Sequence, residues 1–332
     1  MPSAFETAVV TGGSRGMGLA VARQLAEKGA NVVIVARDQA KLLDSLSYVK
    51  ADAANKSNQR FHQISADLTS SSEAVRVLDE VASWNGGIPP DIVWCCAGSS
   101  HPTLFVDTPV SEFSTQMNHN YFTALYMAHA TLRQWLPREH SVEKPGAPPS
   151  KPAPARHLIF TASFLAFYSF TGYSPYSPCK AALRSLSDTL SQEVNMYAAA
   201  NPSQPKVRLH TIFPAGILTE GFEAENRIKP DVTKLLEAGD KPLTPELIAS
   251  RSIKGLESGQ ELITTDFQTG LVGRSMLGGS VRGGFVRGLV DWMLASLLVV
   301  VMVFVRGDMD KKVRDWGTKF GVSGMKPGRN SA

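Results

Sequence analysis

A tyrosine and a lysine with the spacing of proton-transfer groups lie at Tyr176 and Lys180. On a helix, side chains four residues apart share a face. A phenol has a pKa of about 10 and is a poor acid or base at neutral pH. A nearby ammonium favours the phenolate and should lower that pKa. Tyr176 can then donate its proton to the oxygen of a carbonyl group under reduction. Tyr173 is excluded from this role because the residue four positions on is Ser.

Two further polar side chains can join this pair. Ser163 directly follows a predicted strand, upstream of the tyrosine, and its hydroxyl can hold the same carbonyl oxygen. Asn120, in a predicted helix over residues 110–135, can complete a proton relay through water to Lys180. Asn118 competes with Asn120 for this position. The four side chains together predict acid–base chemistry on a carbonyl group.

A glycine-rich loop, TGGSRGMG, separates the first predicted strand from an amphipathic helix. Gly12 permits the tight turn out of the strand, Gly16 lets the backbone approach a pyrophosphate, and Gly18 lets the helix pack closely on the sheet. The anion then lies at a helix N-terminus, where free N–H groups and the helix dipole stabilise it. The loop therefore predicts a dinucleotide site.

The end of the second predicted strand distinguishes NADPH from NADH. An Asp or Glu at this point would bind the ribose 2′-hydroxyl. Here the strand ends in Arg37, a cation that suits a 2′-phosphate. Arg15 in the glycine loop can reach the same group, whereas Asp38 could instead accept the ribose hydroxyls. Because two cations converge on one predicted phosphate, we expect NADPH.

Short apolar runs alternate with longer amphipathic stretches, as in a doubly wound α/β protein. Continuous apolar strands indicate burial on both faces of a mostly parallel sheet. The predicted strands span residues 7–10, 32–36, 61–65, 92–95, 157–161, 208–213 and 261–265. The predicted helices span residues 16–28, 39–51, 71–83, 110–135 and 179–199. This order of elements predicts a Rossmann fold.

These motifs together resemble the short-chain dehydrogenase/reductase family, whose pattern combines the glycine loop, an Asn, a Ser and a YxxxK pair. The resemblance covers residues 5–265, and it implies a nicotinamide cofactor and the catalytic set Ser163, Tyr176, Lys180 and Asn120. The chain departs from the family at residues 95–98, where CCAG replaces NNAG. The Ala and Gly of this segment keep the close backbone approach to the cofactor.

The resemblance also implies individual cofactor contacts. Asp67 corresponds to the residue that contacts adenine, and Thr219 to the residue that bonds the nicotinamide carboxamide. The full set of expected cofactor contacts is Gly12, Ser14, Arg15, Gly16, Gly18, Arg37, Asp67, Leu68, Ala97, Gly98, Tyr176, Lys180 and Thr219.

The composition of the 332 residues argues against several other classes of protein. The formal net charge is +4, and the basic residues do not cluster with aromatic ones, so nucleic-acid binding is not expected. Three cysteines without a CxxC pair predict neither a disulfide framework nor a metal site. The N-terminus lacks the pattern of a signal peptide. We expect a catalytic domain over residues 1–270, with a Pro-rich surface insertion at 138–155, and a tail over 271–332.

Residues 220–254 resemble 3-ketodihydrosphingosine reductases, which are enzymes of sphingolipid synthesis. This resemblance implies reduction of a long-chain 3-keto sphingoid base with NADPH. Glu223 and Glu225, in a predicted loop, are candidate partners for the substrate amine. A retinoid or steroid reductase of the same family is the alternative enzyme. A non-catalytic NADPH-binding scaffold is the alternative outside enzymes, and the retained Tyr and Lys argue against it.

An apolar run with basic flanks lies in the tail at residues 289–305. A bilayer span needs about 20 apolar residues, and Asp291 within the run would be costly there. We expect membrane attachment, as a span or as a re-entrant or interfacial anchor. A core helix, or an interface between copies of the chain in a homo-oligomer, is the alternative. The resemblance implies the endoplasmic reticulum membrane, with the catalytic domain facing the cytosol.

Overall fold

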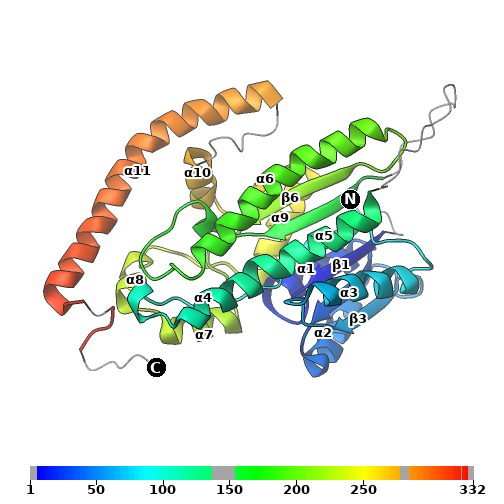
Figure 1. The fold of residues 1–332 in the computed structure, drawn as a ribbon, viewed down its shortest axis with the longest axis horizontal. Coiled ribbons are helices and arrows are strands. Elements are labelled where there is room, and N and C mark those ends of the chain that lie inside the picture. Colours follow the sequence, from blue (N-terminus) through cyan, green and yellow to red (C-terminus); the bar gives the residue numbers. More distant parts are fainter. Residues whose placement is uncertain (1–5, 137–153, 277–283, 323, 328–332) are drawn as a thin grey trace.

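Parallel strands that are buried on both faces form the centre of the molecule. The computed structural model describes residues 6–136, 154–276, 284–322 and 324–327. Within them, seven parallel strands form one sheet in the order β3-β2-β1-β4-β5-β6-β7 (Figure 1). The strands are β1 (Thr7–Thr11), β2 (Asn31–Ala36), β3 (Phe61–Ser65), β4 (Ile92–Cys95), β5 (Arg156–Thr161), β6 (Val207–Phe213) and β7 (Leu262–Thr264). The strand order reverses at β1, so the predicted doubly wound Rossmann fold is confirmed.

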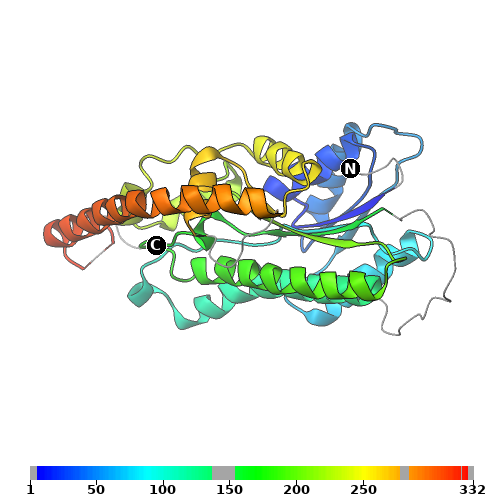
Figure 2. The ribbon, with the colours of Figure 1, turned by 90° about the horizontal axis from the view of Figure 1, so that it is seen from above.

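Helices cover both faces of the sheet (Figure 2). The α-helices are α1 (Gly16–Glu27), α2 (Gln39–Ala51), α3 (Ser71–Trp84), α4 (Val110–Met117), α5 (Thr123–Trp135), α6 (Ser177–Ala200), α7 (Glu220–Ile228), α8 (Asp231–Leu236), α9 (Pro245–Glu257), α10 (Phe267–Ser275) and α11 (Gly284–Phe320). Since side chains alternate along a strand, Val9 and Val33 pack with α3, α5 and α6. Their neighbours Ala8 and Val32 pack with α1, α2 and α9. The two apolar layers hold the sheet as a fixed frame for the loops at its edge.

Two segments differ from the expectation drawn from the sequence. The predicted helix over residues 110–135 is interrupted by a π-helical turn, η2 (Asn118–Phe122), between α4 and α5. The predicted loop after β6 contains the helices α7 and α8. Thr219 caps α7 by accepting a hydrogen bond from the Phe222 N–H at 3.1 Å, and Pro230 separates the two helices by capping α8. Neither the wider turn nor these short helices leave a strong apolar period in the sequence.

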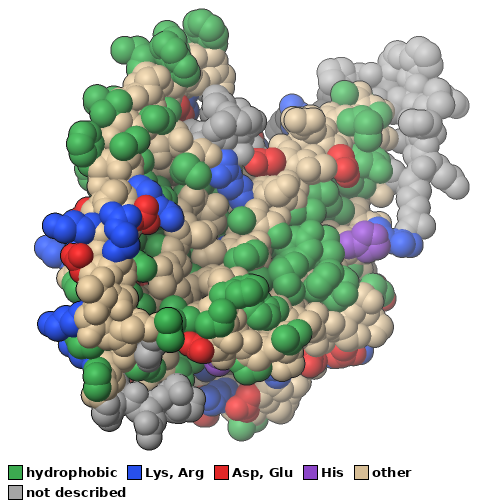
Figure 3. Space-filling view, turned by 60° about the vertical axis from the view of Figure 1, so that its left-hand side comes forward, with side chains coloured by type: hydrophobic (Ala, Val, Ile, Leu, Met, Phe, Trp, Pro, Cys, Tyr) green, Lys and Arg blue, Asp and Glu red, His purple; other side chains and the backbone are tan. Residues whose placement is uncertain are grey.

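The tail forms one long helix rather than a short apolar segment. Within the described residues, the 37-residue helix α11 is the one helix long and apolar enough to cross a membrane. Asp291 of α11 pairs with Arg274 of α10 at 3.2 Å, and α11 also contacts α8. Figure 3 shows hydrophobic side chains along α11. The predicted Pro-rich insertion at residues 138–155 lies almost entirely outside the described residues.

Two histidines form a stacked pair between β5 and β6. His210 Nδ1 lies 2.7 Å from the backbone oxygen of Gln260. That oxygen can only accept, so Nδ1 of His210 carries a proton. His210 Nε2 then accepts a hydrogen bond from His157 Nδ1 at 2.9 Å. Burial, followed by the neighbouring His210, lowers the pKa of His157 to about 4.

We expect the free energy of unfolding to fall as the pH drops from about 6.5, the pKa of an exposed histidine, toward 4. In this window the unfolded chain binds more protons than the folded chain, so acid favours unfolding. His157→Phe should flatten this part of a urea-unfolding profile measured against pH. His129→Gln, at an exposed position of α5, should leave the profile unchanged. An unaltered profile for His157→Phe would contradict this assignment.

Candidate active site

A pocket of about 1690 Å³ lies along the carboxyl edge of the sheet. In open parallel sheets this edge is where ligands bind, near the point at which the strand order reverses. The loops that follow β1 to β6 all contribute to its lining. The pocket brings together every residue predicted for the cofactor or for catalysis, namely Gly12, Ser14, Arg15, Gly16, Gly18, Arg37, Asp67, Leu68, Ala97, Gly98, Asn120, Ser163, Tyr176, Lys180 and Thr219.

The glycine loop needs its glycines for steric reasons. Gly12 and Gly16 have φ angles of 65° and 54°, in the left-handed region that favours glycine. A Cβ on Gly18 would collide with the carbonyl oxygen of Gly12. A Cβ on Gly12 would lie 2.9 Å from the backbone nitrogen of Ala97. The loop from β1 therefore lies directly against the loop from β4.

Thr11, which the motif analysis left without a role, joins these two loops. Its hydroxyl accepts hydrogen bonds from the backbone N–H groups of Cys96 and Ala97, at 3.1 and 3.2 Å. The helix α1 begins beside them, and its N-cap residue Arg15 provides no side-chain cap. Uncapped N–H groups at a helix N-terminus bind anions. The cradle and the donor groups therefore fit the pyrophosphate of a dinucleotide.

The end of the pocket beside β2 and β3, where the sequence predicts that adenine binds and which we call the adenine end, carries the predicted charged residues. Arg15 and Arg37 are both exposed there. Asp38, the competing carboxylate, caps α2 by accepting a hydrogen bond from the Lys41 N–H at 3.1 Å. Asp67 accepts from the backbone of Thr69 at 3.1 Å, and this hydrogen bond is the main reason that its pKa is lowered.

The reacting side chains gather where β5 ends and α6 begins. Ser163 follows β5, accepts a hydrogen bond from the Leu165 N–H at 3.2 Å, and lies close enough to Tyr176 for its hydroxyl to influence the pKa of the phenol. Lys180 lies one helical turn after the tyrosine, with its Nζ 5.5 Å from the centre of the phenol ring. Lys180 Nζ donates to the backbone oxygen of Thr161 at 2.9 Å. This arrangement places two hydroxyls and a buried ammonium around one point of the pocket.

The expected lowering of the tyrosine pKa is wrong for this structure. Burial, followed by the charge of Glu225, raises the pKa of Tyr176, while the hydrogen bond from Ser163 opposes the shift. Burial also lowers the pKa of Lys180 to about 8. Loss of water is the largest cause of both shifts, because desolvation disfavours both the phenolate and the ammonium. Tyr176 therefore carries its proton at neutral pH.

The π-helical turn η2 places Asn120, and not Asn118, at the pocket. Asn120 is buried at the pocket, whereas Asn118 is exposed and does not line it. Asn120 Oδ1 accepts from the Ser99 N–H at 3.2 Å, and its Nδ2 donates to the Ser99 oxygen at 2.8 Å. A Cβ on Gly98 would lie 2.7 Å from Asn120 Oδ1 and 3.5 Å from Lys180 Nζ. Gly98 thus lets the asparagine and the lysine approach each other.

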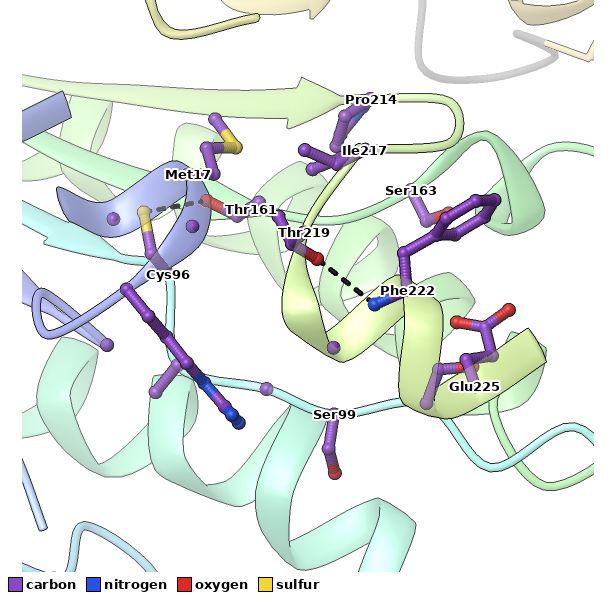
Figure 4. A pocket seen from close by; sticks show the side chains of 18 of the residues that line it. Met17, Cys96, Ser99, Thr161, Ser163, Pro214, Ile217, Thr219, Phe222 and Glu225 are labelled. Atoms are coloured by element: carbon purple, nitrogen blue, oxygen red, sulfur yellow. Dashed lines mark hydrogen bonds between the residues drawn. The ribbon is translucent and has the colours of Figure 1, made fainter. Parts of the chain in front are cut away.

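Thr219 and Cys96 both line the pocket shown in Figure 4, and each is already hydrogen bonded. The Thr219 hydroxyl caps α7 and points toward the Phe222 nitrogen. Cys96 Sγ, which replaces an amide of the family pattern, accepts from the Thr161 hydroxyl at 3.4 Å. A Cβ on Gly16 would lie 3.1 Å from Thr219 Cγ2, so Thr219 packs directly against the glycine loop.

The end of the pocket formed by α7 and α8 holds a group of ion-paired residues, of which only Glu225 was predicted from the sequence. Of the two candidate glutamates, Glu225 lines the pocket, but Glu223 is exposed and does not. Glu225 pairs with the fully buried Lys229 at 3.0 Å, and Lys229 also pairs with Glu237 at 2.7 Å. The Glu225–Lys229 spacing of i and i+4 is the one signal in the sequence that could have indicated an ion pair.

Comparisons with known proteins agree with this geometry. The family model described as short chain dehydrogenase matches residues 6–229. The chain is 50% identical over 330 residues to the 3-ketodihydrosphingosine reductase ksrA of Aspergillus fumigatus, covering 97% of this chain and 87% of that protein. It is 40% identical over 322 residues to the 3-ketodihydrosphingosine reductase gsl-3 of Neurospora crassa, covering 97% and 85%.

Solved structures support the fold. A short-chain type dehydrogenase/reductase from Mycobacterium ulcerans has a TM-score of 0.62 at 20% identity, over 78% of this chain and 87% of that one. An actinorhodin polyketide ketoreductase variant with NADPH has a TM-score of 0.61 at 16% identity, over 80% and 97%. Fold, motif geometry and family match agree, and we conclude that this chain is an oxidoreductase of the short chain dehydrogenase family.

Proposed function

We propose that the protein reduces the ketone of 3-ketodihydrosphingosine to an alcohol with NADPH, giving dihydrosphingosine. The similarity to reductases of this name over nearly the whole chain carries the proposal. The pocket supplies the acid that such a reduction needs, because Ser163 and Tyr176 present two hydroxyls to one ketone oxygen. A nicotinamide dinucleotide bound along the strand edge would supply the hydride.

In this proposal each reacting side chain has a separate task. Ser163 and Tyr176 hold the ketone oxygen, and Tyr176 donates its proton as negative charge develops there. Lys180, with a pKa of about 8, stabilises the phenolate that remains and can exchange a proton near neutral pH. Asn120 is a positioning residue, since its amide joins η2 to the Ser99 backbone beside Lys180. The Thr161 oxygen keeps the lysine amine in place.

The substrate assignment can be tested by offering purified full-length protein NADPH with 3-ketodihydrosphingosine, retinal or a ketosteroid. We expect NADPH oxidation with the first ketone, and a decrease in kcat of about 100-fold or more in Tyr176→Phe with NADPH binding retained. Tyr197→Phe, farther along α6 and away from the pocket, should behave as wild type. Much faster turnover of retinal or the steroid would overturn the substrate assignment. Near-normal turnover by folded Tyr176→Phe would overturn the acid.

The choice of NADPH is proposed from the charges at the end of β2. Arg37 and Arg15 are exposed there, whereas Asp38 is engaged in capping α2. Loss of one charge-assisted contact to a phosphate costs about 1.5–3 kcal/mol. Arg37→Ala should therefore raise the KM for NADPH about 10-fold or more. The KM for NADH serves as the internal control and should change little, and Arg133→Ala on the exposed face of α5 should change neither. Equal losses with both cofactors would indicate a structural role.

Membrane attachment is proposed for α11, together with the division into a catalytic domain at residues 1–270 and a tail. Trp292, Leu297 and Phe304 of this helix are 66%, 65% and 74% exposed. The helix region contacts the rest of the structure near both ends: Asp291 pairs with Arg274 of α10, and the Gly324 oxygen, just after α11, accepts from the Val232 N–H of α8 at 3.2 Å. A helix held near both ends against α10 and α8 lies along a bilayer surface rather than across it. We propose such an interfacial anchor on the cytosolic side of the endoplasmic reticulum.

The anchor can be tested with Leu297, Val300 and Phe304, all exposed, replaced together by Glu. We expect the full-length protein to sediment with membranes and to need detergent for release. The triple variant should be released without detergent while keeping its turnover of a soluble short-chain ketone, because its docking contacts are intact. The same three residues replaced by Leu or Ile provide the control. Wild-type protein that fractionates as soluble would show that α11 packs or forms an interface instead.

A further inference from the structure

A buried ion cluster forms the wall of the pocket beyond the reacting tyrosine. Lys229 is 0% exposed, and its Nζ lies 3.0 Å from Glu225 and 2.7 Å from Glu237. The hydroxyl of Tyr173 lies 2.7 Å from Glu225 Oε1 and 2.5 Å from Glu237 Oε1. Both glutamates and Tyr173 line the pocket, whereas Lys229 lies behind them. The carboxylates therefore face the ligand space, and the ammonium does not.

The cluster carries an excess of negative charge. Two carboxylates surround one ammonium, and Tyr173 stays neutral because burial and the two glutamates raise its pKa. Tyr173 has one proton and can donate to only one of the two oxygens near it. The formal charge of the four groups is therefore −1. Lys229 itself is fully buried, so its ammonium group is shielded from water. The two carboxylates are 14% and 18% exposed, so water screens this charge only in part, and a cationic donor from a ligand would neutralise it.

The other charged residues that line the pocket also make its α7–α8 end more acidic than its adenine end. The adenine end combines basic and acidic residues, which are Arg15, Arg37 and Lys41 with Asp38, Asp44 and Asp67. Among the described lining residues after β6, acidic ones dominate: Glu220, Glu225, Glu237, Asp240 and Asp266, against Lys234. Lys234 also lies 3.9 Å from Asp231, a carboxylate that does not line the pocket. The α7–α8 end of the pocket thus suits a cation, and the opposite end, with the glycine loop and two arginines, can hold an anionic dinucleotide.

The cluster is also close to the reacting point. The ring centres of Tyr173 and Tyr176 are 6.3 Å apart, and the charge of Glu225 acts on the Tyr176 hydroxyl. Glu225 and Ser163 lie at the same end of the pocket in Figure 4, with Phe222 between them. In a 2-amino-3-ketone the amine is on the carbon next to the ketone. A ketone held by Ser163 and Tyr176 therefore has its amine within one carbon of the reacting point, and the cluster is the group of carboxylates beside that point.

We propose that Glu225 and Glu237, held in place by Lys229 and Tyr173, bind the ammonium group of a long-chain 2-amino-3-ketone and select it over neutral ketones. This inference rests on the proposed function, and it names the part of the substrate that the pocket recognises. An added ammonium brings the cluster to neutrality and donates to carboxylate oxygens that have no proton of their own. A neutral ketone leaves the negative charge uncompensated, which gives discrimination by charge rather than by chain length.

The test compares 3-ketodihydrosphingosine with its deamino analogue, in which hydrogen replaces the amine. The measured quantity is the ratio of kcat/KM for the two ketones, in full-length protein with saturating NADPH. Glu237→Gln makes the cluster formally neutral and keeps an oxygen for Tyr173. We expect this ratio to fall about 10-fold or more in Glu237→Gln, mainly through KM for the amino ketone. Glu223→Gln, on the exposed side of the same helix region, is the matched control and should keep the wild-type ratio.

Each result has a defined meaning. An unchanged ratio in Glu237→Gln, or an equal loss on both ketones, would overturn amine recognition while leaving the proposed reaction in place. Wild-type protein that reduces the deamino ketone but not the amino ketone would instead overturn the proposed function.

Inhibition of the wild-type protein provides a second measurement in case Glu237→Gln does not fold. Dihydrosphingosine should inhibit at least about 10-fold more strongly than the corresponding deamino diol. The two compounds share the chain and both hydroxyls, so the comparison isolates the amine. Equal inhibition by the two compounds would overturn the inference without any variant.

Discussion

The hydrogen bond from the Lys180 amine to the Thr161 backbone oxygen, 2.9 Å long, holds the reacting side chains in their relative positions. It joins the buried Lys180 in the first turn of α6 to the half-buried last residue of β5, at the wall of the pocket. Tyr176 begins the same turn, and Ser163 follows the same strand, so their relative positions depend on this contact. Gly98 then has to lack a side chain, because a Cβ there would approach both Asn120 and Lys180.

The strands and the glycine loop could be predicted closely from the sequence, because each depends on local pattern. The strand Ile92–Cys95 has the predicted bounds, since a buried parallel strand is a continuous apolar run. Phe61–Ser65 also has the predicted bounds, although it is a mixed, mostly half-buried strand at the edge of the sheet. The glycine loop, Ser163, Tyr176 and Lys180 share one pocket because parallel strands all end at one edge. A motif at the end of each strand is therefore brought together by topology alone.

The remaining features depend on contacts between distant segments. Glu225, Glu237 and Tyr173 lie on three different stretches of chain, and no local period connects them. The π-helical turn at Asn118–Phe122 adds a residue to a helix whose pattern looks regular. The direction of the Tyr176 pKa shift could not be predicted from the spacing of Tyr176 and Lys180. The spacing does not show the loss of water around both side chains, which is the largest cause of their pKa shifts. Desolvation is a property of the assembled site.

The helix α11 follows every strand of the sheet in chain order. During synthesis, the whole sheet has therefore left the ribosome before the apolar stretch that we assign to lipid. Domains fold as units, and the N-terminal ones fold first. The α/β core can thus acquire its structure before the apolar helix is complete, with α10 and α8 already formed as docking points for α11.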